Sequence, residues 1–215
     1  MSVYGRIKDM KRKIKGIERA GKRLIDIIVS LICLILLAIP FILVALAIKI
    51  NSKGPVFFKA ERVGYRRKGF IVYKFRSMVE NAASVGLGVE TSAEDPRITR
   101  VGKFLRNWSI DELPQLINVL RGDMSLVGPR PAMSHQVDKY SPEELGRLEV
   151  RPGLTGWAQV NGRNLLSWKE RIELDLWYID NWSLLLDIKI LFITPWKIIS
   201  REGLYGKNGK VTDYE

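Results

Sequence analysis

Apolar residues are spread unevenly along the chain, and the longest run without a charged side chain is Ile27–Ile48. As a helix rising about 1.5 Å per residue, these 22 residues would reach about 33 Å, enough to cross the hydrocarbon core of a bilayer. Pro40 is expected to break the run into limbs of about 13 and 9 residues, each reaching about one leaflet. The pattern permits a kinked single span or a hairpin whose two ends lie on one side of the membrane.

Upstream of this run, apolar residues recur at spacings of three and four, with lysine and arginine between them. This pattern predicts an amphipathic helix over residues 1–23, either at a membrane surface or docked on the rest of the fold. The density of cations beside the apolar run favours the membrane surface. The apolar positions are Val3, Ile7, Met10, Ile14 and Ile17.

Downstream, the pattern changes to short apolar stretches separated by turns. Residues 54–75 are rich in β-branched and aromatic residues, which predicts a hairpin or small sheet. Ser109-Ile-Asp-Glu112 matches a capping box, so a helix is expected from there to about Arg121, with Gly122 ending it.

The C-terminal half is predicted to contain two further helices, one opened by Ser141-Pro142 and one over Trp168–Asn181. Between them, Arg151–Asn164 is rich in glycine and expected to be irregular, and it lacks the residue order of a P-loop. Leu184–Ile199 is apolar but interrupted by charges and a proline, so it is a poor bilayer span. It lies either in the membrane interface or against the core.

The net charge of +12 is concentrated beside the apolar run. Residues 1–23 sum to +7 and residues 49–78 to +8, whereas residues 79–215 sum to −2. Cations on both sides of an apolar segment are typical of a membrane protein, because each gains about 1 kcal/mol near anionic head groups. Their position, and the lack of a recognised binding motif, argue against a nucleic-acid partner.

Only one cysteine, Cys33, and one histidine occur in the chain. An internal disulfide framework is therefore excluded, and a zinc site would need carboxylate ligands. This composition fits a protein that faces a reducing cytosol.

Asp111 and Glu112 are adjacent carboxylates at the start of a predicted helix, with Arg106 before them and Arg130 after them. Capping and the helix dipole explain both acids without any chemistry. The same residues also suit a Mg²⁺ and phosphate site, because Mg²⁺ takes one or two carboxylates together with substrate phosphates and guanidinium groups bind phosphate oxygens in pairs. Spacing alone leaves both interpretations open.

Three longer motifs carry a resemblance to a known family. They are YKFRSM (73–78), WSIDELPQLINVLRGDMSLVGPRP (108–131) and RPGLTGWAQVNGRN (151–164), in this order behind one proline-broken apolar segment. Together they resemble the bacterial sugar transferases called monotopic polyprenyl-phosphate phosphoglycosyl transferases, of the small type with little beyond a catalytic unit and its anchor. The match extends from about residue 20 to about residue 200.

The resemblance implies transfer of a phospho-sugar from a UDP-sugar to undecaprenyl or a similar polyprenyl phosphate, with release of UMP and with Mg²⁺ as cofactor. It assigns Asp111 as the nucleophile that forms a covalent intermediate and Glu112 as a residue that helps to hold Mg²⁺. Lys74, Arg106 and Arg130 are expected to contact phosphates. Such a reaction starts the membrane stage of bacterial capsule, lipopolysaccharide, exopolysaccharide or glycoprotein glycan synthesis.

For the fold, the resemblance favours a re-entrant hairpin at the cytosolic face of the bacterial inner membrane, in a helix-rich α+β protein with a short β element. Members of the family often have Ser before the breaking proline, whereas Ile39 stands here and cannot hydrogen-bond a freed carbonyl. The expected parts are a basic interfacial helix (1–23), a membrane hairpin broken at Pro40 (24–50), a cytosolic catalytic domain (51–200) and a tail (201–215).

The composition also permits a different class of protein, a membrane-anchored scaffold that binds lipid or nucleotide sugar without turnover. The carboxylate pair among cations and the three-motif match argue against it. The sequence does not specify the sugar, the prenyl length or the oligomeric state.

Overall fold

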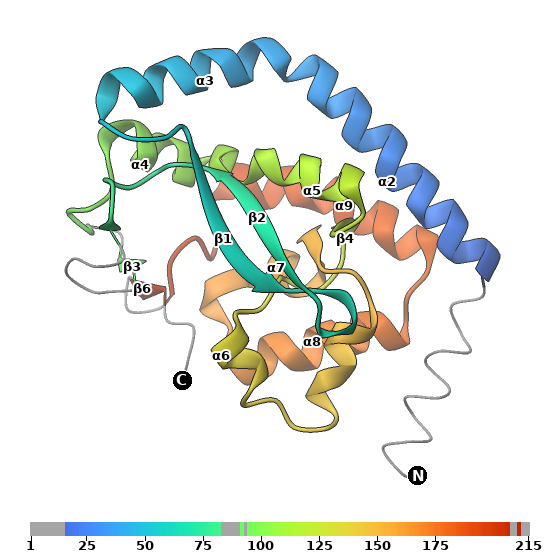
Figure 1. Cartoon of the computed structure of the whole chain (residues 1–215). Helices are drawn as coiled ribbons and strands as arrows, with labels where there is room; N and C mark the ends of the chain where they lie inside the picture. Colours follow the sequence, from blue (N-terminus) through green and yellow to red (C-terminus); the bar gives the residue numbers. More distant parts are fainter. Residues whose placement is uncertain (1–15, 83–90, 93, 207–209, 212–215) are drawn as a thin grey trace.

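The structure is a computed structural model that describes residues 16–82, 91–92, 94–206 and 210–211. Two helices, α2 (Gly16–Leu36) and α3 (Ala38–Asn51), form an arch over one side of the molecule (Figure 1). Beneath the arch lie further helices and three two-stranded sheets, which confirms the helix-rich α+β prediction. Most of the predicted amphipathic helix over 1–23 falls on residues 1–15, which lie outside the described residues.

The apolar run is broken as predicted, but the break is at Leu37 rather than at Pro40. Proline lacks an N–H and its ring clashes with the carbonyl of the residue four positions earlier, here Leu36, so the distortion falls on its N-terminal side. Pro40 itself lies in the first turn of α3, where its missing N–H costs little. Both helices extend beyond the ends of the apolar run and are therefore longer than the predicted limbs, with 21 residues in α2 and 14 in α3.

Within the described part of the chain, no single helix has both the length and the apolar character needed to cross a bilayer. The segments Ala20–Leu36 and Ala38–Asn51 meet these criteria only as a pair, and they are bent by 61° relative to each other.

The bent pair has a packed inner side and an exposed outer side. Val29, Cys33 and Leu34 of α2 pack on the main core, while Phe41 and Ile48 of α3 pack on a second cluster. Many large apolar side chains on the outer side are more than one-third exposed. They include Leu24, Leu31, Ile32, Ile35, Leu36, Ile39, Ile42, Leu43, Leu46 and Ile50.

The predicted hairpin is confirmed and consists of β1 (Phe57–Val63) and β2 (Gly69–Phe75) in an antiparallel pair. It crosses the front of the molecule below the arch (Figure 1). Val72 and Phe75 of β2 are buried, because one belongs to the main core and the other packs with α3. Lys74 follows Val72 on the same face of the strand, since side chains alternate along it.

The helix predicted from Ser109 differs from expectation at its start. Residues Ile110–Gln115 form a 3₁₀ helix, and the α-helix α5 covers only Leu116–Arg121. Ser109 has a left-handed backbone (φ 53°) and its side chain makes no cap, so the predicted capping box is wrong. Gly122 does end the helix, with φ 89°, in the conformation that favours glycine.

The glycine-rich stretch supplies strand β5 (Gly153–Thr155), which pairs in parallel with β4 (Ser125–Val127). The two backbones approach closely at Gly153, where an added Cβ would lie 2.1 Å from the Gly128 nitrogen. A larger residue at this position would therefore displace the loop that follows β4.

Helix α8 (Trp168–Asp180) matches its prediction and has a complete capping box at Ser167. The segment after Ser141 also begins with reciprocal bonds between Ser141 and Glu144, but it forms a 3₁₀ helix over Glu144–Glu149 rather than an α-helix. The remaining elements are the 3₁₀ helix Tyr65–Arg67, β3 (Thr91–Ser92), α4 (Arg100–Asn107), α6 (Ser134–Val137), α7 (Trp157–Val160), the 3₁₀ helix Arg163–Leu165, α9 (Leu184–Ser200) and β6 (Lys210–Val211).

Helix α9 combines the two alternatives considered for the last apolar segment. Ile190 is completely buried in the main core, so one face packs as a core helix does. Leu185, Phe192 and Trp196 on the same helix are at least 70% exposed. The structure therefore confirms core packing for one face and leaves an apolar outer face.

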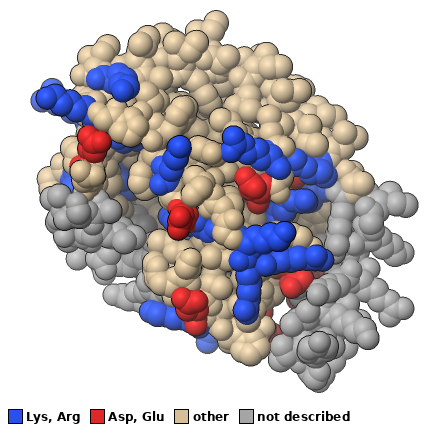
Figure 2. All heavy atoms as spheres, viewed as in Figure 1, with Lys and Arg blue, Asp and Glu red and all other residues tan. Residues whose placement is uncertain are grey.

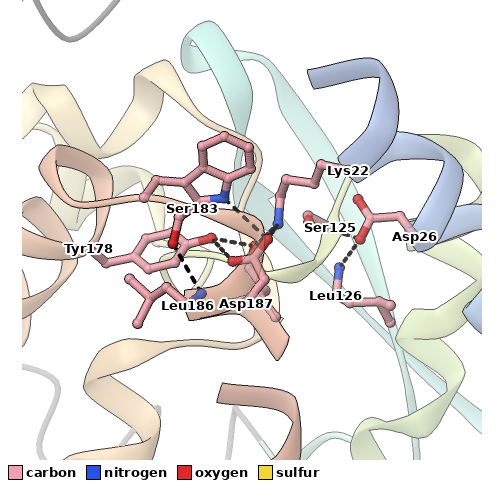
Figure 3. Close-up of polar contacts among 10 residues, drawn as sticks. Lys22, Asp26, Ser125, Leu126, Tyr178, Ser183, Leu186 and Asp187 are labelled. Atoms are coloured by element: carbon pink, nitrogen blue, oxygen red, sulfur yellow. Dashed lines mark hydrogen bonds and ion pairs between the residues drawn. The ribbon is translucent and has the colours of Figure 1, made fainter. Parts of the chain in front are cut away.

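A buried polar network joins α2 to the core through Asp187 of α9 (Figure 3). Its carboxylate accepts hydrogen bonds from Lys22 Nζ at 2.5 Å, Tyr178 Oη at 2.6 Å and Trp182 Nε1 at 3.1 Å. Lys22 Nζ also donates to the Val127 carbonyl at 3.0 Å, so one ammonium group connects α2, α9 and β4.

One turn further along α2, Asp26 binds the same strand (Figure 3). Its Oδ1 accepts from the Leu126 N–H at 3.0 Å and from Ser125 Oγ at 3.1 Å. Because the Ser125 N–H binds the Pro152 carbonyl beside β5, the next N–H, that of Leu126, points to the opposite edge of β4, where Asp26 accepts its hydrogen bond. The arch is thereby fixed to the strand that leads to Arg130.

We expect Asp187→Ala to lower the free energy of unfolding by about 3–5 kcal/mol, because it removes the carboxylate that balances the Lys22 ammonium and accepts from the Tyr178 phenol and the Trp182 indole. Leu185→Ala, on the exposed face of the same helix, should change it by less than about 0.5 kcal/mol. Denaturant unfolding in detergent measures both values. Equal effects of the two changes would show that the network does not hold α2 in place.

Candidate active site

The adjacent acids predicted from the sequence lie on the 3₁₀ helix Ile110–Gln115, and Glu112 is surrounded by donors. Arg130 binds its carboxylate with two nitrogens, at 2.8 Å to Oε1 and 3.2 Å to Oε2. Lys74 Nζ is 3.0 Å from Oε1, and Gln115 Nε2 is 3.1 Å from Oε2. The structure thus brings together three predicted residues from two separate motifs, and it adds Gln115.

Each cation reaches Glu112 from a rigid element. Lys74 stands near the end of β2, and Arg130 lies in the loop after β4. This loop is fixed to β5 by backbone bonds from Gly128 N to Thr155 O and from Gly153 N to Pro129 O. The positions of both cations are therefore determined by the strands rather than by their flexible side chains alone.

Charge compensation at Glu112 is strong. Burial acts to raise the pKa of the Glu112 carboxyl, but Arg130 and Lys74 outweigh it and hold this pKa well below its usual range. Glu112 is consequently ionised at neutral pH, and its two cationic partners carry one more positive charge than it neutralises. This surplus suits an anionic ligand.

Asp111 behaves differently from its neighbour. Burial, followed by the charge of Glu112, raises the pKa of the Asp111 carboxyl to about 6 in spite of Lys74, Arg106 and Arg130. Its carboxylate accepts no hydrogen bond from the residues that the structure describes, whereas Glu112 accepts four. Two adjacent acids in different environments are a common arrangement in catalytic sites.

Two further arginines lie at this site. Arg106, at the end of α4, acts electrostatically on Asp111 and donates to Thr91 Oγ1 at 3.2 Å. Arg163 was not predicted, although it belongs to the glycine-rich motif. Its guanidinium donates to Ser109 Oγ at 3.3 Å and interacts electrostatically with both acids, while burial lowers its pKa.

Cations also gather on the surface of the molecule. Figure 2 shows lysine and arginine side chains across the middle of the face on which the hairpin lies. Most of the rim formed by the arch carries no charged side chain. These surface cations and the apolar outer side of α2 and α3 thus occupy separate regions of the molecule.

Comparison with known proteins identifies the family. The family model described as "Bacterial sugar transferase" matches residues 17–201, which include the arch, the hairpin and all the site residues. The chain belongs to this sugar transferase family.

The relatives of this sugar transferase include one without an assigned reaction and others whose names give one. The chain is 46% identical to "Uncharacterized sugar transferase EpsL" of Bacillus subtilis, over 87% of this chain and 91% of that protein. It is 43% identical to "UDP-glucose:undecaprenyl-phosphate glucose-1-phosphate transferase" of Escherichia coli and 41% identical to "Undecaprenyl-phosphate galactose phosphotransferase" of Salmonella typhimurium. Each of these two alignments covers 89% of this chain but only 43% of the relative, so the chain spans less than half of their length.

The described residues of the transferase contain no group of three or more His, Cys, Asp or Glu side chains suited to a metal ion. Two adjacent carboxylates nevertheless fit Mg²⁺, because this ion keeps several waters and is bound by one or two carboxylates together with substrate phosphates. Asp111, whose carboxylate accepts no hydrogen bond in the described structure, fits such an ion. Glu112 would have to exchange one of its four hydrogen bonds for the ion, because both of its oxygens already accept bonds. A closed zinc site does not fit them, since it needs four protein ligands.

Pro40, predicted as the membrane break, lies on the exposed part of the arch and is not part of the site of the transferase. The five other predicted residues lie together, since Lys74, Arg106 and Arg130 act directly or electrostatically on the pair Asp111 and Glu112.

We expect the Asp111 carboxyl to titrate near pH 6 in Mg²⁺-free buffer. Glu112→Gln should lower this pKa, because it removes the negative charge that helps to raise it. Carbon-13 NMR of labelled aspartate measures the titration. Glu173→Gln, an exposed change on α8, should leave it unaltered, and an unchanged pKa in Glu112→Gln would mean that the two acids are not coupled.

Proposed function

We propose that this protein transfers a phospho-sugar from a UDP-sugar to undecaprenyl phosphate or a similar polyprenyl phosphate and releases UMP. The observation that carries the proposal is the Asp111–Glu112 pair, held among Lys74, Arg130, Arg106 and Arg163 in a member of the sugar transferase family. The names of two relatives specify undecaprenyl phosphate as acceptor, one with glucose and one with galactose. Because these two sugars differ, the proposal does not specify the sugar of the donor.

The chemistry divides into two displacements at phosphorus. In the first, a carboxylate oxygen of Asp111 forms a bond to the sugar-linked phosphorus, and the bond to the oxygen of UMP breaks, so UMP leaves with the electron pair. In the second, an oxygen of the polyprenyl phosphate attacks the same phosphorus and displaces Asp111. The carboxylate is regenerated, and the product is a polyprenyl diphosphate sugar.

Asp111 suits the role of nucleophile because its carboxylate is not tied up by hydrogen bonds within the described structure. Glu112 does not suit it, since both of its oxygens already accept bonds from cationic or amide groups. Its fixed negative charge instead serves to place Lys74 and Arg130 next to the reacting phosphates. The two acids therefore have different roles because their surroundings differ.

Cations have to lower the repulsion between a carboxylate and a diphosphate, both of which are anionic. Arg130 and Lys74 meet beside Asp111, and Arg106 and Arg163 add positive charge from α4 and from the glycine-rich segment. Mg²⁺, held by Asp111 and by Glu112 in exchange for one of the hydrogen bonds that Glu112 accepts, would supply further neutralisation of the diphosphate and the leaving phosphate.

Placement at a membrane is part of the proposal. The exposed apolar outer side of α2 and α3 supports insertion of the bent pair into one leaflet, with both ends at the cytosolic face of the bacterial inner membrane. The exposed apolar face of α9 supports a position in the interface. The water-soluble donor and the lipid acceptor then reach one site at head-group depth.

The first test is UMP release from a panel of UDP-sugars by the purified protein in nanodiscs, with and without Mg²⁺ and undecaprenyl phosphate. We expect one or a few donors to give UMP, and Asp111→Asn to reduce turnover by at least about a thousandfold, because the amide is a poor nucleophile. Asp138→Asn, the same chemical change at an exposed position, should retain activity. Turnover by Asp111→Asn would remove Asp111 as nucleophile, and a folded parent protein that releases no UMP would favour an anchored scaffold.

The re-entrant arrangement predicts that both ends of the bent pair react from the same side. In a Cys33→Ala background, single cysteines at Ala20 and Lys53 should react with a membrane-impermeant maleimide in inverted vesicles and not in right-side-out vesicles. A cysteine at Asp138 reports the side of the globular domain. Opposite labelling of the Ala20 and Lys53 positions would instead establish a single span.

A further inference from the structure

Asn118 makes an unusual set of contacts for a side chain in the core. It lies on α5 and is completely buried. Its Oδ1 accepts from the Tyr73 N–H at 3.1 Å, and its Nδ2 donates to the Ile71 carbonyl at 2.6 Å and lies 3.4 Å from Asp123 Oδ2. One amide group thus pairs with two backbone groups of β2.

These two backbone groups belong to the same edge of the strand. Ile71 and Tyr73 are two residues apart, so the carbonyl of one and the N–H of the other point in the same direction. The amide therefore closes part of the second edge of β2, as a residue of an additional strand would. Without Asn118, a buried donor and a buried acceptor would be left unpaired.

The two backbone groups that Asn118 binds lie on either side of Val72 in the sequence, and the Val72 side chain is buried in the main core. Lys74 is the next residue on the same face of β2, and its amine is 3.0 Å from Glu112. Residues 110–121 therefore hold β2 at two points, through the Asn118 amide and through the Glu112 carboxylate. The contact with the Asn118 amide fixes the backbone of β2, and the Lys74 side chain extends from this backbone to Glu112.

We propose that Asn118 is a positioning residue for the transfer reaction, because its amide fixes the end of β2 so that the Lys74 amine meets Glu112. The inference rests on the proposed function, in which Lys74 acts on the substrate phosphates beside Glu112. Asn118 touches neither the acids nor Lys74 through any hydrogen bond, so it acts through the strand. A displacement of about 1 Å at such a site costs up to about a hundredfold in rate.

The test is a double-mutant cycle on UMP release. Asn118→Ser removes the amide and leaves room for water at the freed backbone groups, and we expect it to lower kcat about tenfold in the parent protein. In a Lys74→Met background, the same change should lower kcat less than about twofold, because the group that it positions is already absent. A tenfold loss in both backgrounds would overturn the proposal.

Two variants separate positioning from loss of stability. Val119 is completely buried on the same helix, and its side chain cannot form a hydrogen bond to β2. Val119→Ala should lower stability but leave the hydrogen bonds between Asn118 and β2 in place, so kcat should stay within about twofold. Asn118→Asp keeps an acceptor for Tyr73 but places a carboxylate oxygen against the Ile71 carbonyl and near Asp123, so it should lose at least as much activity as Asn118→Ser. Equal losses in Val119→Ala and Asn118→Ser would contradict the proposal.

A second readout does not depend on turnover. Acetylation of Lys74 by acetic anhydride, followed by peptide mass spectrometry, should be at least about threefold faster in Asn118→Ser relative to exposed Lys103, because the amine is released from Glu112. An unchanged ratio would overturn the proposal even if the activity falls. If the parent protein releases no UMP, the proposed function fails, and the acetylation ratio still decides whether Asn118 positions Lys74.

Discussion

The site depends on one carboxylate, Glu112, that is shared by two cations. Lys74 and Arg130 come from segments more than fifty residues apart, and Glu112 gives both of them a common partner. Because their charges exceed that of Glu112, the cluster holds excess positive charge directly beside Asp111. An anionic diphosphate can approach a carboxylate nucleophile only where such charge has already been placed.

Buried polar side chains that close strand edges hold these cations in position. Asn118 closes part of an edge of β2 close to Lys74, and Asp26 and Lys22 bind backbone groups of β4, the strand that leads to Arg130. Short strands of two-stranded sheets have few partners of their own, so helices α5 and α2 supply the missing ones. The arch that we propose enters the membrane is thereby linked to the active site through buried hydrogen bonds.

Patterns of apolar residues predicted the hairpin, α8 and the broken apolar run, because these elements depend on local periodicity and on proline. The position of the break was missed by three residues, since the clash of Pro40 acts on the preceding turn. The capping box at Ser109 failed for a tertiary reason: the serine adopts a left-handed backbone and its hydroxyl is used by Arg163. Arg163 has a positive φ and follows Gly162, so no helical or strand pattern indicated where its side chain would lie.

The functional residues were predicted mainly through the resemblance of three motifs to a family, and the family match over residues 17–201 confirms that resemblance. Spacing alone could not separate a capped helix from a phosphate site. The convergence of Lys74 and Arg130 on Glu112 depends on long-range packing, which a single sequence does not display. The same limit applies to Gln115 and Asn118, since both read as ordinary polar positions of a helix.

The central claim is that Asp111 carries the phospho-sugar between donor and acceptor. It is tested most directly by mixing the protein with its UDP-sugar and Mg²⁺ in the absence of polyprenyl phosphate, quenching rapidly and measuring the intact mass. The account predicts an added mass equal to one phospho-sugar, located at Asp111 by fragmentation, absent from Asp111→Asn and lost when the lipid acceptor is added. Turnover with no such adduct, or an adduct on another residue, would contradict it.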